Sequence, residues 1–195
     1  MKPIHALASL LLGLVTHSAQ AVVYDRVAPE RSRLAFAYKQ MGVAMNGGFK
    51  RFTAQLAFDP ARPEQGVFSL DLDMSSIDAG YPEANAEVVG KDWFDVKRFP
   101  QARFVSSGVR ALGGNRYEAR GTLTIKGKTR PVTAPFTLRA DKAGASLDGS
   151  FVLKRLDYGI GEGAWGDPGV VADEVAIQFT IATGTASALP GPRKP

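Results

Sequence analysis

The residue types that most often do chemistry in proteins are nearly absent from this sequence. It has no cysteine, and its two histidines, His5 and His17, lie close to the N-terminus. Histidine is the commonest metal ligand and has the ordinary pKa nearest neutrality, while cysteine is the ready soft ligand and nucleophile. The sequence therefore argues against a metal site of zinc, copper or histidine-ligated haem, and against Ser-His-Asp or Cys-His catalysis.

The remaining candidates for chemistry are acidic and glycine-rich patterns. Asp71 and Asp73 share one face of a strand-like segment, about 6 to 7 Å apart, a separation that glycosidases also use. They alternate with apolar residues, so we expect them to point into water. Residues 121–129 resemble a phosphate-binding loop, but five residues separate the glycines instead of four and they read as a strand.

Arg155 and Asp157 are a more open case. Two positions apart on a strand-like stretch, they share a face and could orient a polar ligand head. The alternative that we favour is a structural ion pair with Asp92 or Asp95, which would fix a loop to the body of the protein.

The N-terminus has the features of a secretory signal peptide. Lys2 precedes an apolar run of about ten residues, and residues 19–21 form a small-x-small cleavage site. We expect cleavage after Ala21 and export to the periplasm. The formal charge falls from +5 to about +4 when Lys2 is lost, and basic residues are scattered, so nucleic-acid binding is not expected.

Alternation of apolar and polar residues dominates the rest of the chain and predicts strands with one dry face. Alternating runs cover residues 33–39, 52–59, 68–75, 117–126, 132–139, 147–153 and 175–181. Turn-forming residues separate them, as at 46–48, 113–115, 126–128 and 141–144, and these short connections predict antiparallel neighbours. Residues 82–90 predict a short helical insertion. Such strands must form either two packed sheets or a closed barrel.

Many of the 18 aromatic residues fall on the alternating apolar face. They could simply fill a core. As a set they also suit the lining of an apolar cavity, because an eight-stranded barrel is just wide enough to hold either side chains or one ligand. Trp93, Phe94 and Trp165 fall in irregular segments and could form a mouth or plug one end.

Four segments resemble the YceI-like family, and together they span nearly all of the predicted mature chain. They are residues 46–59, 76–78 with 91–104, 121–132 and 154–161. They are similar to the family's glycine-aromatic turn, its aromatic-aspartate turn, its G-x-L-T-I-x-G-x-T-x-P-V hairpin and its R-x-D-F/Y-G-I stretch.

This resemblance implies an all-β, lipocalin-like antiparallel eight-stranded β-barrel with a short helical insertion, over residues 22–185. Residues 1–21 would be the signal peptide and 186–195 a disordered tail. The resemblance also implies a bound long-chain isoprenoid or quinone-like lipid, no other cofactor and no catalytic residues. A link to envelope stress or to a membrane b-type cytochrome and quinone chemistry is a further implication.

The candidate ligand-binding residues are apolar or aromatic side chains of the alternating faces and irregular segments: Phe36, Tyr38, Phe52, Phe94, Phe104, Leu123, Ile125, Phe136, Phe151, Tyr158, Trp165 and Phe179. We expect a periplasmic carrier that is a monomer or homodimer. Two alternatives stay open: an envelope enzyme that uses Asp, Glu, Tyr or Lys on a lipid or carbohydrate, and an interaction module for a membrane cytochrome.

Overall fold

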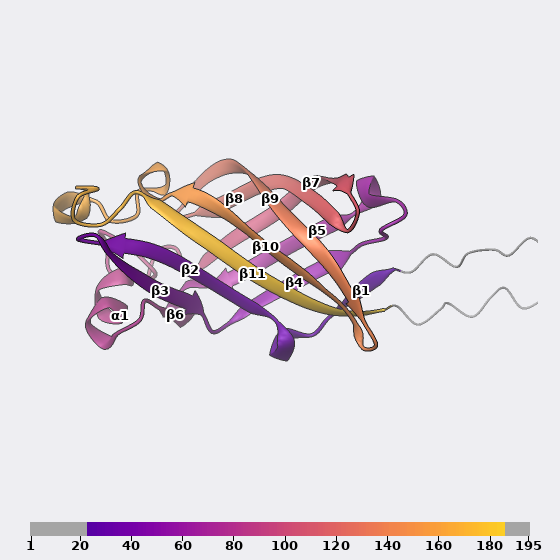
Figure 1. The fold of residues 1–195 in the computed structure, drawn as a ribbon. Helices are drawn as coiled ribbons and strands as arrows, with labels where there is room; N and C mark the ends of the chain where they lie inside the picture. The colour runs from indigo at the N-terminus through magenta and orange to yellow at the C-terminus, as the bar shows by residue number, and fades with distance from the viewer. Residues whose placement is uncertain (1–22, 186–195) are drawn as a thin grey trace, which may run out of the picture.

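The computed structural model describes residues 23–185, which form one long antiparallel sheet that curls on itself (Figure 1). The predicted signal peptide (1–21) and C-terminal tail (186–195) lie outside the described residues. The strands are β1 (Tyr24–Val27), β2 (Arg33–Gln40), β3 (Val43–Phe49), β4 (Phe52–Ala57), β5 (Val67–Asp73), β6 (Ile77–Asp78), β7 (Gln101–Gly113), β8 (Arg116–Ile125), β9 (Lys128–Asp141), β10 (Gly144–Lys154) and β11 (Glu174–Thr185), with one α-helix, α1 (Pro82–Val88).

The eleven strands of residues 23–185 correspond to eight barrel strands, three of which are interrupted. β1 and β2 follow one another along β11, β3 and β4 form the next interrupted strand, and β5 and β6 the third. A pair of hydrogen bonds between the backbones of Tyr24 and Phe58 joins β1 to the end of β4 and completes the wall. The prediction of an antiparallel, lipocalin-like barrel is confirmed.

The interruptions have local causes. Pro29 begins a 3-10 turn (Pro29–Arg31) between β1 and β2, where its missing N–H ends the ladder. Between β5 and β6 the chain makes another 3-10 turn (Met74–Ser76), and the Asp73 carboxylate accepts the Ser75 N–H at its start. These breaks allow the strands to bend around an elongated interior.

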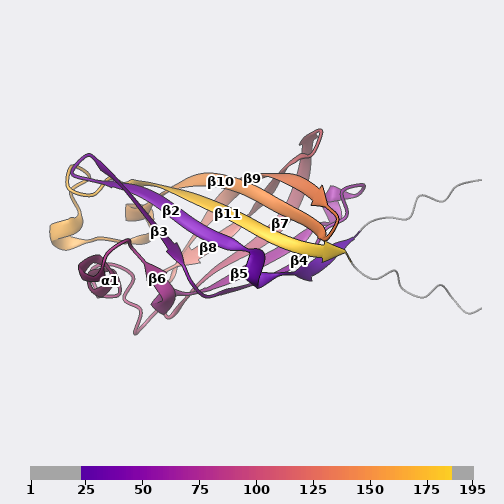
Figure 2. The same cartoon turned by 60° about the horizontal axis from the view of Figure 1, so that its bottom comes forward.

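The helix predicted over residues 82–90 is present as α1. Pro82 stands in its first turn with Glu83 beside it, and Gly90 follows its end. Figure 2 shows that α1 and the loops between β10 and β11 lie at one end of the barrel, whereas both ends of the described chain lie at the other. α1 is therefore placed to border an opening of the barrel.

One predicted turn is wrong. Residues 46–48 lie within β3, and the true hairpin turn is at Met41 and Gly42. Gly47 is needed because a Cβ at this position would overlap the Phe36 ring of the neighbouring strand. The glycines therefore mark a close packing contact inside the sheet.

Candidate functional site

The interior of the barrel contains an apolar cavity of about 410 Å³. This volume lies within the range of about 300–1,000 Å³ typical of small-molecule sites. Inward-facing rings such as Phe36, Phe104, Phe151 and Phe179 are only half-buried although they point into the barrel, because the cavity leaves part of their surface uncovered. The interior is therefore not packed solid.

Aromatic side chains close the end of the barrel at which β1 meets β4. Phe58 is completely buried there, and its ring packs edge-on against Tyr117 at 5.0 Å between centroids. Tyr24 lies in the same buried cluster. The cavity reaches Phe136, which stacks on Tyr117, but not the Tyr24, Phe58 or Tyr117 side chains behind it. Within residues 23–185 this end of the cavity is blind.

The opposite end of the cavity is bordered by polar and exposed groups. Gln40 at the end of β2, Tyr81, and the exposed Glu83 and Glu87 of α1 all line it there. Trp165 joins them from the loop before β11, and its Nε1–H donates to the Glu87 carboxylate at 2.9 Å. This end is the mouth of the cavity.

Two tryptophans from distant segments meet at the mouth. The rings of Trp93 and Trp165 lie 5.5 Å apart and tilted, and both line the cavity. The Trp93 Nε1–H is buried and has no acceptor among the described residues. The sequence-based placement of these tryptophans at one end of the barrel agrees with this geometry.

Arg155 holds the loops of the mouth together. Its side chain is 2% exposed, and its guanidinium donates five hydrogen bonds to backbone carbonyls. The acceptors are the carbonyls of Ile160, Gly161, Trp165, Val171 and Ala172, at 2.7 to 3.2 Å. Its positive charge is buried, and this burial lowers the pKa of the guanidinium. Arg155 therefore acts as a clamp on residues 160–172.

Two expectations about Arg155 are wrong. Residues Arg155–Tyr158 form a 3-10 turn and not a strand, because the chain leaves β10 at Lys154. No ion pair joins Arg155 to Asp92 or Asp95 in the described chain, where Asp95 pairs with Arg98 at 3.2 Å instead. Backbone carbonyls take the place of the expected carboxylate.

Ten of the twelve candidate residues line the cavity: Phe36, Tyr38, Phe94, Phe104, Leu123, Ile125, Phe136, Phe151, Trp165 and Phe179. Their contact with a ligand stays a prediction. Phe52 and Tyr158 do not line it. Phe52 begins β4 at the break after β3, where it packs against the core and borders a second pocket, while Tyr158 is buried in the core.

The sequence interpretation missed the lining contributed by α1. Ala84 and Val88 are one helical turn apart and both face the cavity, as do Glu83 and Glu87. The spacing of four between Ala84 and Val88 is the signal that could have placed this helix face inward.

The other polar candidates lie outside the cavity. Asp71 pairs with Arg103 at 3.2 Å and Asp73 with Arg51 at 2.8 Å, so both face outward as expected. Tyr38 differs from these residues because it lines the cavity. Its hydroxyl donates to the Ala79 carbonyl, and burial raises the pKa of this hydroxyl.

Across residues 23–185 no cluster of acidic side chains suits a metal ion, and no helix there is long and apolar enough to cross a membrane.

An up-and-down β-barrel with a blind apolar cavity and a polar mouth defines a class, the lipocalin-like barrels. Within it, residues 26–183 match the YceI-like domain, and the chain belongs to the YceI-like family.

Three relatives show how far the likeness extends. A UPF0312 protein of Pseudomonas savastanoi pv. phaseolicola is 30% identical over 166 residues, covering 80% of this chain and 86% of the relative. The crystal structure of Burkholderia cenocepacia BcnA is 43% identical with a TM-score of 0.78, covering 83% of this chain and 99% of that one. A polyisoprenoid-binding domain from Saccharophagus degradans, implicated in plant cell wall breakdown, is 13% identical with a TM-score of 0.62, covering 86% and 100%. This last likeness is one of fold.

Proposed function

We propose that this protein is an exported, periplasmic carrier that holds a long-chain isoprenoid or quinone-like lipid in its barrel and catalyses no reaction. The observation that carries the proposal is the blind apolar cavity that opens at a polar rim. A lipid with one long apolar tail and a compact head fits such a space with its tail inward and its head at the mouth.

The energetics favour a tail over a polar ligand. An isoprenoid tail has no hydrogen-bonding groups along its length, so it needs only apolar contact. Burial of apolar surface contributes about 25 cal/mol per Å² before the costs of association. The cavity walls supply mostly aliphatic and aromatic side chains for this contact.

Two further findings support the proposal. A structural neighbour of the same fold is named for polyisoprenoid binding. The signal-peptide pattern of residues 1–21 supports export, which would bring the protein to the membrane lipids of the envelope.

The test begins with the mature protein purified without detergent. Extraction with organic solvent and mass spectrometry should recover a long-chain lipid in a reproducible ratio to protein. Absence of lipid from several preparations, together with no binding of an added polyprenol, would overturn the proposal.

A matched pair of variants links the lipid to the cavity. Ile177 lies between Phe36 and Phe151 on the cavity wall, so Ile177→Trp should obstruct the cavity and lower the recovered lipid several-fold. Val152 is 60% exposed on the neighbouring strand, so Val152→Trp should leave the lipid ratio unchanged. Equal lipid in both variants would place the ligand elsewhere.

A membrane b-type cytochrome as the recipient of the lipid stays a prediction, as does a role in envelope stress. Co-purification of such a cytochrome with both the lipid-loaded and the lipid-free protein would favour direct docking.

Sedimentation of the purified protein would distinguish the monomer from the homodimer.

A further inference from the structure

The charged side chains that line the cavity gather at its mouth. Among residues 23–185 they are Glu83 and Glu87 on α1 and Arg155 below the rim. The head group of a lipid bound tail-first would lie near these three residues. Their charges and free hydrogen-bonding groups therefore decide which head groups the mouth accepts.

Arg155 is the one basic residue among the described lining residues, and none of its N–H groups is free to bind a ligand. A guanidinium carries five N–H donors. All five are engaged by backbone carbonyls. To bind a phosphate, Arg155 would have to release one or more of these carbonyls, and its bonds to those of Ile160, Gly161 and Val171 are buried, so a released carbonyl there would lack a partner.

The two glutamates place negative charge at the rim. They are four residues apart on α1, so they occupy the same helix face, and both are exposed. The Glu87 carboxylate also accepts the Trp165 N–H, which fixes it beside the mouth. An anionic head group entering here would be repelled by both carboxylates.

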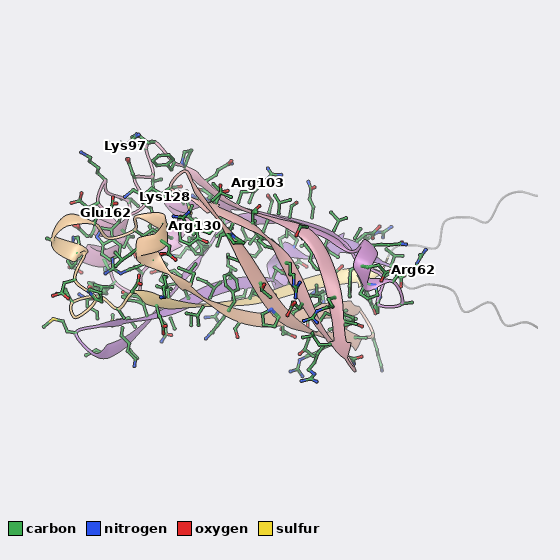
Figure 3. All side chains as sticks on the ribbon, turned by 90° about the horizontal axis from the view of Figure 1, so that it is seen from above. Arg62, Lys97, Arg103, Lys128, Arg130 and Glu162 are labelled. Carbon is green, nitrogen blue, oxygen red and sulfur yellow. The ribbon has the colours of Figure 1, made fainter. Side chains whose placement is uncertain are left out.

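The other described basic residues near this end of the barrel do not line the cavity; Lys126 is 10% exposed and donates to the Gly159 carbonyl and to Glu162. Lys97, Lys128 and Arg130 are found there (Figure 3), and the cavity lining includes none of them. Lys128 lies 3.9 Å from the Glu162 carboxylate, and Arg130 donates to the Asp157 carbonyl. Lys128 and Arg130 are therefore engaged outside the cavity, while the carboxylates of Glu83 and Glu87 border it.

Uncharged polar groups complete the rim. The Tyr81 hydroxyl donates to the Gln40 side-chain oxygen over a long 3.3 Å. The Trp93 indole N–H, part of a side chain that is 9% exposed, lacks an acceptor within the described residues. Groups of this kind suit a neutral oxygen, which can accept a hydrogen bond without bringing charge to the site.

We infer that the mouth selects long-chain lipids with an uncharged, oxygen-bearing head group and excludes the phosphorylated form of the same chain. This inference rests on the proposed function, since it concerns the head of a lipid whose tail fills the cavity. It assigns Glu83 and Glu87 as the residues that determine head-group specificity.

The test compares two probes of equal chain length, geranylgeraniol and geranylgeranyl monophosphate, on the lipid-free mature protein. Both tryptophans of the chain line the cavity near its mouth, so their fluorescence reports binding. The alcohol should bind at least about ten-fold more tightly than the phosphate at low salt. The difference should shrink as salt screens the carboxylates.

Charge variants then identify the source of the selectivity. The double variant Glu83→Gln, Glu87→Gln should tighten binding of the phosphate more than binding of the alcohol. Glu30→Gln, Glu64→Gln removes the same charge from two 3-10 turns outside the cavity lining, and should leave the ratio of the two affinities unchanged.

The outcomes are distinguishable. Phosphate that binds as tightly as alcohol overturns the inference and leaves the proposed function standing. A ratio that changes equally in the two double variants overturns the role of Glu83 and Glu87. Failure of both probes to bind contradicts the proposed function itself.

Discussion

Replacement of Arg155 by lysine is the most direct test of the clamp at the mouth. The substitution keeps the positive charge but reduces the number of side-chain donors from five to three. At least two of the five carbonyls that Arg155 now serves must lose their partner. A purely electrostatic role would survive this change, whereas a role in satisfying the carbonyls would not.

The size of the effect follows from burial. A buried polar group left without a partner costs about 1–3 kcal/mol, so two of them cost about 2–6 kcal/mol. A domain of this size loses roughly 2–4 °C in Tm for each kcal/mol. We therefore expect Arg155→Lys to lower Tm by at least about 4 °C, and Arg155→Met to lower it further.

Urea unfolding and calorimetry of the variants measure this loss. Arg103→Lys is the matched control, because Arg103 is 58% exposed and pairs only with Asp71 on the outer face. It should change stability by less than about 0.5 kcal/mol. Amide hydrogen exchange should also accelerate in residues 160–172 of Arg155→Lys. A lysine variant as stable as the parent, with unchanged exchange there, would refute the clamp.

Three more predictions concern the two ends of the barrel. Phe58→Ala should cost about 3–5 kcal/mol in urea unfolding because the ring is completely buried; a loss below about 1 kcal/mol would contradict its role as a plug. Trp165→Phe removes the hydrogen bond to Glu87 and should speed amide exchange in residues 163–166 at a cost below about 1 kcal/mol, and unchanged exchange would count against that contact. Asp59 accepts backbone and arginine N–H groups that hold its pKa below the ordinary 3.8, so the unfolded chain takes up its proton first as pH falls. The ionised Asp59 carboxylate therefore stabilises the fold above about pH 4, and this stabilisation is lost on acidification. Asp59→Asn should reduce the dependence of the unfolding free energy on pH between about 5 and 3. An unaltered slope would refute the assignment.

The regular part of the fold could be predicted from the sequence because the barrel has one dry face throughout. Alternation in β2, β5, β8 and β11 points the same side chains inward that the structure finds there. β3 escaped prediction because Gly47 and Gly48 interrupt its alternation, and the reason for Gly47 is a contact with a ring on another strand. Local patterns cannot report such a contact.

The mouth was less predictable for a related reason. The partners of Arg155 are carbonyls of residues 160–172, and carbonyls are common to every residue type. Only the folded path of the loop brings them together. Gly161 gives a partial signal, since it has a φ of +71° and a Cβ there would meet the Arg155 guanidinium. Phe52 shows the opposite limit: its alternation correctly predicts packing against the core, but at the first position of β4 it does not reach the cavity.

The plug of Tyr24, Phe58 and Tyr117 limits how a ligand could enter and leave the cavity. In the part of the chain that the structure describes, these three rings close the β1 end of the interior, and the rim that we assign as the mouth lies at the α1 end. On the carrier function that we propose, a lipid could therefore not cross the barrel from one end to the other. The proposed carrier would then load and release its lipid through the same rim, and a second lipid could enter only after the first had left.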